Sequence, residues 1–433
     1  MPSPRTLLPW LLGGALGLGG ILQGLHSRSS GSGAGLTELD SRLRAASEEI
    51  ARLKRENESL RSLAQGGGEV AVPRELIDRA EKEFALRFLS NPVLHRIAGE
   101  ELRDRVAAAL ESRLGPSGID DRRTAYQMIG WLDPDDDLLA QLTAVRAVGA
   151  RGWFDDVTGE AWVTDRFDAK NIPDQALLVR LLARILLHQH FPPAPAYPGD
   201  DAARARDALH QGAAAGSEAR FYAANARASG FVPMKANTEV EQLLASLPEF
   251  IQGLTTFPLI EGKGLADTLH VRGNDPFLAA FRNPPQTTRA ILLPAAPAAE
   301  PPLLKLPAVP EEPYLIESAG QLGLRLWLEP MGDVGAASEI ASGWKSDRYL
   351  LVPDGEASSA VLWDIELESK DAADRFQSAA LERVSAMAGL EASAAPGKVV
   401  TTPARRHLRI TRPSANCVRF LNAATAALAE KSD

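Results

Sequence analysis

Residues 174–191 read DQALLVRLLARILLHQHF, and this stretch decides how the middle of the chain folds. Pro173 and Asp174 suit the first turn of a helix, where a proline loses no hydrogen bond and an acidic side chain meets the positive end of the helix dipole. Pro192 and Pro193 then end the helix. Leu, Val, Ile and Ala occupy almost its whole circumference, which predicts a helix buried in the core.

Two charges interrupt this apolar helix. Arg180 and Arg184 are four residues apart and therefore lie on one face. An arginine keeps its charge at any workable pH, and burying it without a partner costs on the order of several kcal/mol. We therefore expect carboxylates or carbonyls to close over the two guanidiniums, with Glu218 and the Asp200–Asp201 pair as candidates. If no such partner exists, a bound anion becomes the hypothesis.

The segments around the helix resemble those of a family of largely uncharacterised bacterial HExxH (zincin-like) metallopeptidases. The family's helix reads roughly HExxHALQDQHF, follows a turn of the form GfYdp.tg and precedes a helix with an EG pair. Here the turn reads GWFDDVTG (152–159), the helix ends in QHF (189–191), and the next helix carries LHQGAA (209–214). The resemblance implies a zincin-like domain, in which histidines and a later acid hold zinc and the glutamate takes a proton from the metal-bound water.

The same resemblance implies that the metal site has been lost. Aligned on QHF, the first ligand position holds Arg180, the catalytic glutamate position Leu181, the second ligand position Arg184 and the EG acid position Gln211. None of the seven histidines is followed by Glu. Guanidiniums repel a dication and offer it no lone pair. We therefore expect no metal, no cofactor and no catalytic residue.

The resemblance extends over roughly residues 75–400. FPL (257–259) with Gly262, NPPQTTRAILLP (283–294) and GWKSDRY (343–349) are similar to the family's FPY..G, nPP.STEQiLHP and GWgGDry. In the first two of these motifs the family has Tyr, Glu, Gln and His, and the corresponding positions here hold Leu259, Arg289, Ala290 and Leu293. Polar groups are thus missing from several segments at once, which favours an abandoned active site over a local slip of alignment. If the scaffold still binds something, the candidate contact residues are Glu218, His190, His210 and Arg289.

The amino-terminal part predicts a membrane anchor and a coiled coil. Residues 7–25 form an apolar run about long enough to cross a bilayer. No A-x-A-like cleavage site follows, which favours an uncleaved signal anchor over a cleaved signal peptide. Residues 36–64 carry a heptad pattern with Asn57 at an a position, a residue that fixes register and favours two strands. The pattern predicts a parallel homodimer; a single amphipathic spacer helix is the alternative.

These segments divide the chain into four parts: a signal anchor (1–30), a coiled coil with a Gly linker (31–68), a degenerate zincin-like helical domain (70–300) and a small C-terminal α+β unit (301–433). The fold class is α+β and predominantly α-helical. Apolar spacing predicts helices at 74–89, 99–114, 122–150, 371–388 and 417–431, and strands at 322–328, 348–352, 360–367 and 407–411. The acidic turn 133–137 lacks the Gly and Glu of a calcium loop and predicts a helix start.

Charge and motif content limit the function. The net charge of −9 argues against a nucleic-acid partner. The single Cys417 cannot form an intramolecular disulfide, and no G-x-S-x-G elbow is present. We expect a non-catalytic protein of the bacterial cytoplasmic membrane, single-pass and mostly periplasmic. It would use a metallopeptidase-like scaffold for structural assembly or for binding, with an envelope protein as partner. The alternative is an active zinc-dependent metallopeptidase or hydrolase with a non-standard site.

Overall fold

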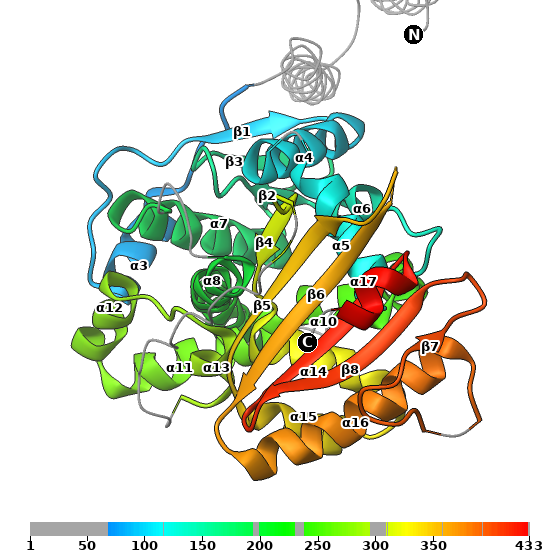
Figure 1. The fold of residues 1–433 in the computed structure, drawn as a ribbon. Helices are drawn as coiled ribbons and strands as arrows, with labels where there is room; N and C mark the ends of the chain where they lie inside the picture. Colours follow the sequence, from blue (N-terminus) through cyan, green and yellow to red (C-terminus); the bar gives the residue numbers. More distant parts are fainter. Residues whose placement is uncertain are drawn as a thin grey trace, which may run out of the picture. The chain divides into compact units, whose positions relative to one another are not determined.

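The computed structural model describes residues 68–431 except 116, 194–198, 230–237, 295–308, 310, 357 and 392. The expected anchor and coiled coil, with Asn57, lie outside the described residues. The chain from Gly66 to Asp433 forms one compact unit, which is α+β and mostly helical (Figure 1). Within the described residues, no helix combines the length and apolar character that crossing a membrane requires.

The described part of the chain before α9 consists of six helices and a short sheet. The helices are α3 (Arg74–Phe84), α4 (Gly99–Leu114), α5 (Gly118–Ile129), α6 (Leu138–Ala147), α7 (Ile172–His190) and α8 (Asp200–Ser229). The sheet has the order β1 (Leu94–Ile97), β3 (Ala161–Thr164), β2 (Gly152–Phe154), with β1 parallel and β2 antiparallel to β3. Six shorter elements follow α8: α9 (Thr238–Ser246), α10 (Glu249–Phe257), a π-helical turn η2 (Pro258–Gly262) that continues into α11 (Lys263–Arg272), α12 (Asn274–Arg282) and α13 (Thr288–Leu292).

Two predicted helices in this part are wrong in their extent. The helix predicted at 74–89 ends at Phe84, because Ala85 adopts the left-handed conformation (φ 52°) and its backbone N–H turns back to α3. The single helix predicted at 122–150 is two helices, since Gly130 ends α5 in the left-handed region (φ 87°). The acidic turn then starts α6, as predicted, because the Asp137 side chain accepts a hydrogen bond from the backbone N–H of Ala140.

The C-terminal part is a six-stranded antiparallel sheet with helices on both faces. Its strand order is β4 (Leu315–Glu317), β5 (Trp344–Pro353), β6 (Ser359–Leu367), β9 (Cys417–Ala423), β8 (His407–Ser414) and β7 (Val400–Thr401). The remaining elements are α14 (Gly320–Leu328), the 3-10 turn η3 (Glu329–Met331), α15 (Val334–Ser342), α16 (Lys370–Ala388) and α17 (Ala426–Lys431). In Figure 1, α17 lies in front of the sheet, whereas α10 and α14 lie behind it.

Two predictions in this part are wrong in type. The strand predicted at 322–328 is α14, and the helix predicted at 417–431 is the strand β9 followed by α17. Both segments are buried on every side: eight of the nine residues of α14 and all seven of β9 are buried. A segment without an exposed face shows no informative alternation, so apolar spacing cannot tell a strand from a helix there.

One apolar core joins the sheet to the preceding helices. The largest buried cluster contains Leu102 of α4 and Ile129 of α5 together with Trp327, Trp363 and Phe420 from the C-terminal part. The end of α5 is also held by hydrogen bonds across this core. The Trp327 indole donates to the Ile129 carbonyl (2.7 Å), and a second carbonyl of α5 accepts from the Asn422 side chain, also at 2.7 Å. The regions before and after residue 300 therefore fold against each other.

Candidate functional site

The long helix α7 is buried, as its sequence predicts. Its first turn contains Pro173, and the Asp174 carboxylate beside it is only 1% exposed. That carboxylate accepts hydrogen bonds from the backbone N–H of Asp168 (2.8 Å) and from Arg151 Nη2 (2.5 Å). The start of α7 is thereby fixed to the loop that precedes it.

Each arginine of α7 pairs with a carboxylate, but only one of the two carboxylates was predicted from the sequence. Arg180 Nη1 lies 3.4 Å from Glu218 Oε2 on α8, with both side chains about one-third exposed. Arg184 is 6% exposed and forms an ion pair with Asp156 in the turn between β2 and β3. Its guanidinium also lies over the Phe154 ring at 5.0 Å, and burial lowers its pKa to about 10.

The Asp200–Asp201 pair was also expected as a partner of Arg180 and Arg184, and this prediction is wrong, because the two carboxylates bind other residues. The Asp200 carboxylate binds Arg122 of α5 (Nη2 at 2.9 Å) and Arg204 (Nη2 at 3.3 Å). Burial alone would raise the pKa of Asp200, and the two arginines outweigh it, so the pKa is lowered. Asp201 instead accepts hydrogen bonds from the backbone N–H and hydroxyl of Thr288. These contacts hold the start of α8 against α5 and α13.

The other two positions of the proposed vestigial metal site hold uncharged side chains. Leu181 is 3% exposed and belongs to the apolar cluster between α7 and the small sheet. Gln211 is half-buried on α8. It precedes Glu218 by seven residues and so lies on the same side of that helix, about 10 Å along it.

The QHF motif at the end of α7 holds the loop that follows α3. Gln189 Oε1 accepts hydrogen bonds from the backbone N–H groups of Leu89 (2.8 Å) and Ser90 (3.4 Å), and its Nε2 donates to Ser90. His190 Nε2 lies 2.7 Å from the Arg87 carbonyl oxygen, and the Phe191 ring stacks on Phe281. In this structure all three side chains bind or pack against other parts of the chain.

Two further histidines belong to α7 and α8. His210 is 4% exposed, with the Phe281 ring edge-on at 4.9 Å. His188 packs against Phe154 and Gly159. Burial lowers the pKa of both imidazoles, and the nearby guanidiniums of Arg206 and Arg184 lower it further, so both are neutral at pH 7.

Arg289 joins two elements of the C-terminal part. Its Nη1 donates to the carbonyl oxygens of Ser342 (2.5 Å) and Trp344 (2.7 Å), and its Nη2 lies 2.5 Å from Glu368. The carbonyl of Ser342 is the last of α15. This arginine thus connects α13 to the end of α15 and the start of β5.

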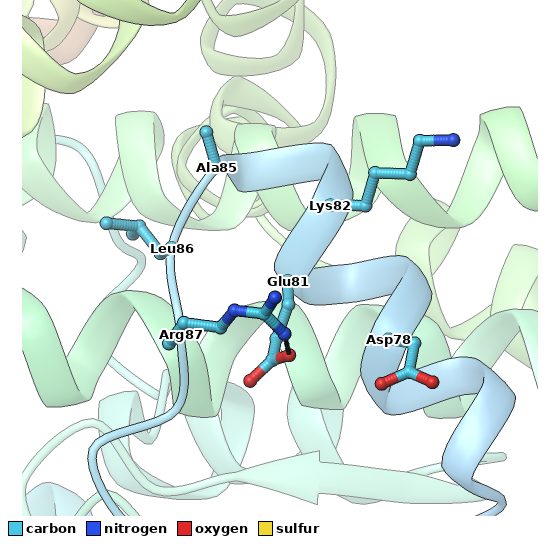
Figure 2. A pocket seen from close by; sticks show the side chains of 6 residues that line it. All are labelled: Asp78, Glu81, Lys82, Ala85, Leu86 and Arg87. Atoms are coloured by element: carbon cyan, nitrogen blue, oxygen red, sulfur yellow. Dashed lines mark hydrogen bonds and ion pairs between the residues drawn. The ribbon is translucent and has the colours of Figure 1, made fainter.

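The hollow in Figure 2 is lined by other residues, and the described part of the chain offers no metal centre. Among the described residues, no three or more His, Cys, Asp or Glu side chains are grouped so that they could hold a metal ion. Figure 2 shows a hollow at the end of α3, lined by Asp78, Glu81, Lys82, Ala85, Leu86 and Arg87. Arg87 crosses it to pair with Glu81 at 2.5 Å. None of the residues that line this hollow belongs to the site predicted on α7 and α8.

Asp156 was not predicted as a partner of Arg184, although this residue stands in the turn that carries the resemblance. The turn offers two neighbouring carboxylates, and sequence alone does not say which one faces α7. In the structure the Asp155 carboxylate accepts a hydrogen bond from the backbone N–H of Val157 within the turn (2.8 Å), which leaves Asp156 to reach Arg184.

Comparison with known proteins identifies one similar region. A family described as a domain of unknown function (DUF8575) matches residues 315–432, which comprise β4 to α17. No curated protein matches the chain. No solved structure matches it either. The C-terminal sheet with its helices is therefore similar to a family of unknown function.

Proposed function

We propose that this chain is a non-catalytic, membrane-anchored envelope protein whose metallopeptidase-like scaffold serves structural assembly or binding. The ion pair between Arg184 and Asp156 carries the proposal, because it occupies the position that the resemblance gives to the second zinc ligand. A guanidinium paired with a carboxylate satisfies both charges there and offers no lone pair to a dication.

The neighbouring replacements support the same role. Arg180 pairs with Glu218 of α8, and Leu181 fills the core at the position of the catalytic glutamate. Each replacement contributes to the contacts between α7 and its surroundings. A chain under selection for packing at these positions, rather than for zinc chemistry, would acquire such side chains.

Metal content tests this proposal directly. We expect the purified full-length protein to contain no stoichiometric zinc by elemental analysis and to cleave a mixed peptide library no faster after zinc is added than after chelation. One zinc per chain, together with chelator-sensitive cleavage, would instead establish the alternative of an active hydrolase with a non-standard site.

The anchor and the coiled coil complete the proposal. We propose that residues 7–25 hold the chain in the cytoplasmic membrane and that residues 36–64 pair two chains in parallel. Full-length protein should resist extraction of membranes by carbonate and should sediment in detergent as a dimer, whereas a variant without residues 36–65 should sediment as a monomer. Cross-linking in membranes followed by purification would then identify the envelope partner.

A further inference from the structure

Four basic side chains of α7 and α8 lie close together, because the charges of Arg184 and Arg206 act on both His188 and His210. Arg184 and His188 are one turn apart on α7, and Arg206 and His210 are one turn apart on α8. The ion pair between Arg180 and Glu218 shows how the two antiparallel helices are aligned. With a rise of about 1.5 Å per residue on each helix, this alignment places His188 and His210 at the same level. We call these four residues the basic seam.

Three nitrogen atoms of the basic seam have no partner. Arg184 Nη1, His188 Nε2 and His210 Nε2 are buried and make no hydrogen bond to any residue that the structure describes. Leaving a buried polar atom unpaired costs about 1–3 kcal/mol, and more for a charged group. Since native proteins pair almost all such groups, three of them in one seam indicate that a small bound species supplies the missing hydrogen bonds.

The hydrogen-bonding capacity of the imidazole and guanidinium groups indicates whether the bound species is a cation or an anion. An imidazole nitrogen can either offer a lone pair to a metal or donate an N–H, but a guanidinium can only donate. Arg184 therefore excludes a metal ion from the seam and favours an acceptor. Its other nitrogen, Nη2, already pairs with Asp156, while the nearby Asp207 pairs with Arg113 at 2.7 Å. These carboxylates are engaged, so the acceptor has to come from outside the protein.

Close packing around the seam limits the size of the acceptor. Gly159 lies so near His188 that a Cβ built on this glycine would be 2.6 Å from the imidazole ring. On the other helix, the Phe281 ring covers His210. Such close packing excludes an extended organic ligand and restricts the acceptor to a small ion.

We propose that the basic seam binds a small anion, of the size of chloride or formate, through Arg184 Nη1 and the Nε2–H groups of His188 and His210. The anion accepts one hydrogen bond from each of the three donors and ties α7 to α8. This site is independent of the proposed function, because an anion can stabilise the seam whether or not the chain has enzymatic activity.

Thermal unfolding of the full-length protein in detergent tests the site. Sodium formate or chloride is titrated against sodium gluconate at constant ionic strength, since gluconate is too large to enter. We expect a saturable rise of the unfolding temperature by about 3 °C with the small anions. A rise that does not saturate, or one that gluconate reproduces, would mean an adventitious ion only and would overturn the proposal.

A matched pair of variants locates the effect. Arg184→Met should abolish the response to formate, whereas Arg180→Met, one turn earlier on the same helix, should retain it. An equal response in both variants would contradict the assignment. If Arg184→Met does not fold, the ¹⁵N resonances of the wild-type histidines decide: formate should shift those of His188 and His210 and leave that of His407 on β8 unchanged. Unmoved seam resonances would show that only water occupies the seam.

Discussion

Gly212 on α8 lies directly against Gly262, the last residue of the π-helical turn η2. A Cβ built on Gly212 would fall well inside van der Waals distance of the backbone of Gly262 and Lys263. A Cβ built on Gly262 would come equally close to the backbone of Ala208. Backbone cannot swing aside as a flexible side chain can. Both glycines stand in segments that carry the family resemblance, so this close approach of two helices gives a structural reason for them.

Replacing Gly262 should therefore destabilise the fold. We expect Gly262→Ala to lower the free energy of unfolding by about 3 kcal/mol, because the added methyl forces α8 and η2 apart. Gly264→Ala is the matched control. Gly264 lies in the helix that follows η2, where a Cβ meets nothing within 4 Å, and the change should stabilise by up to about 1 kcal/mol. Urea unfolding measures both; equal effects would rule out the close contact.

Arg122 provides a second test, at the junction between α5 and the C-terminal sheet. Its side chain is 9% exposed and binds both Asp200 of α8 and Glu317 of β4. Arg122→Leu removes part of the positive charge that compensates these two buried carboxylates. The free energy of unfolding should therefore fall by about 3–5 kcal/mol.

The adjacent residue on α5 serves as the control for this variant. Arg123 forms an exposed pair with Asp120, so Arg123→Leu should change the free energy of unfolding by no more than about 0.5 kcal/mol. Guanidinium unfolding followed by circular dichroism compares the two. A loss at Arg122 no larger than that at Arg123 would show that the junction does not depend on this ion pair.

The type and bounds of an element were predicted best from the sequence where the element has one exposed face or a clear end. The bounds of α4 agree with the apolar spacing, and the strand predicted at 407–411 lies within β8, where buried and partly exposed residues alternate. The strands predicted at 348–352 and 360–367 lie within β5 and β6, although both of these strands are mostly buried. The prediction failed at α14 and β9, where burial on all sides removes the periodic signal. At the candidate site, local spacing predicted that Arg180 and Arg184 share a face, and Glu218 was a correct partner. Asp156 was missed because its contact depends on how a turn folds back on α7.

Asp201 should make stability depend on pH. Burial raises the pKa of this carboxyl to about 7, despite its hydrogen bonds from Thr288. The folded state therefore holds a proton that the unfolded state releases near pH 4, so the free energy of unfolding falls as pH rises from about 4 to 7. The lost contribution is at most about 4 kcal/mol.

Asparagine at this position removes the titration. Asp201→Asn keeps an oxygen to accept from Thr288, so it should flatten the profile between pH 4 and 7 and be more stable than the wild type at pH 8. Asp135→Asn, in an exposed turn, should leave the wild-type slope unchanged. Chemical unfolding at pH 5 and pH 8 gives the comparison. An unchanged slope in Asp201→Asn would show that this carboxyl does not titrate in that range.

Restoring the ligands tests whether α7 corresponds to a zincin helix at all. The variant combines Arg180→His, Leu181→Glu, Arg184→His and Gln211→Glu, which recreates two histidines one turn apart, the acid between them and an acid from α8. Leu181 is buried, so its glutamate and the newly unpaired Asp156 should lower stability in the absence of metal. A bound dication would compensate the charges of this glutamate and of Asp156.

We therefore expect the folded variant to retain one zinc per chain after dialysis and to unfold at a higher temperature with zinc than with chelator. A control in which Arg184 becomes Gln instead of His keeps the other three changes and should lose both effects, because glutamine is a poor zinc ligand. If the fourfold variant has the circular dichroism of the wild type yet gains no stoichiometric zinc, α7 and α8 do not hold the ligand positions, and the equivalence on which the proposed loss of chemistry rests is wrong.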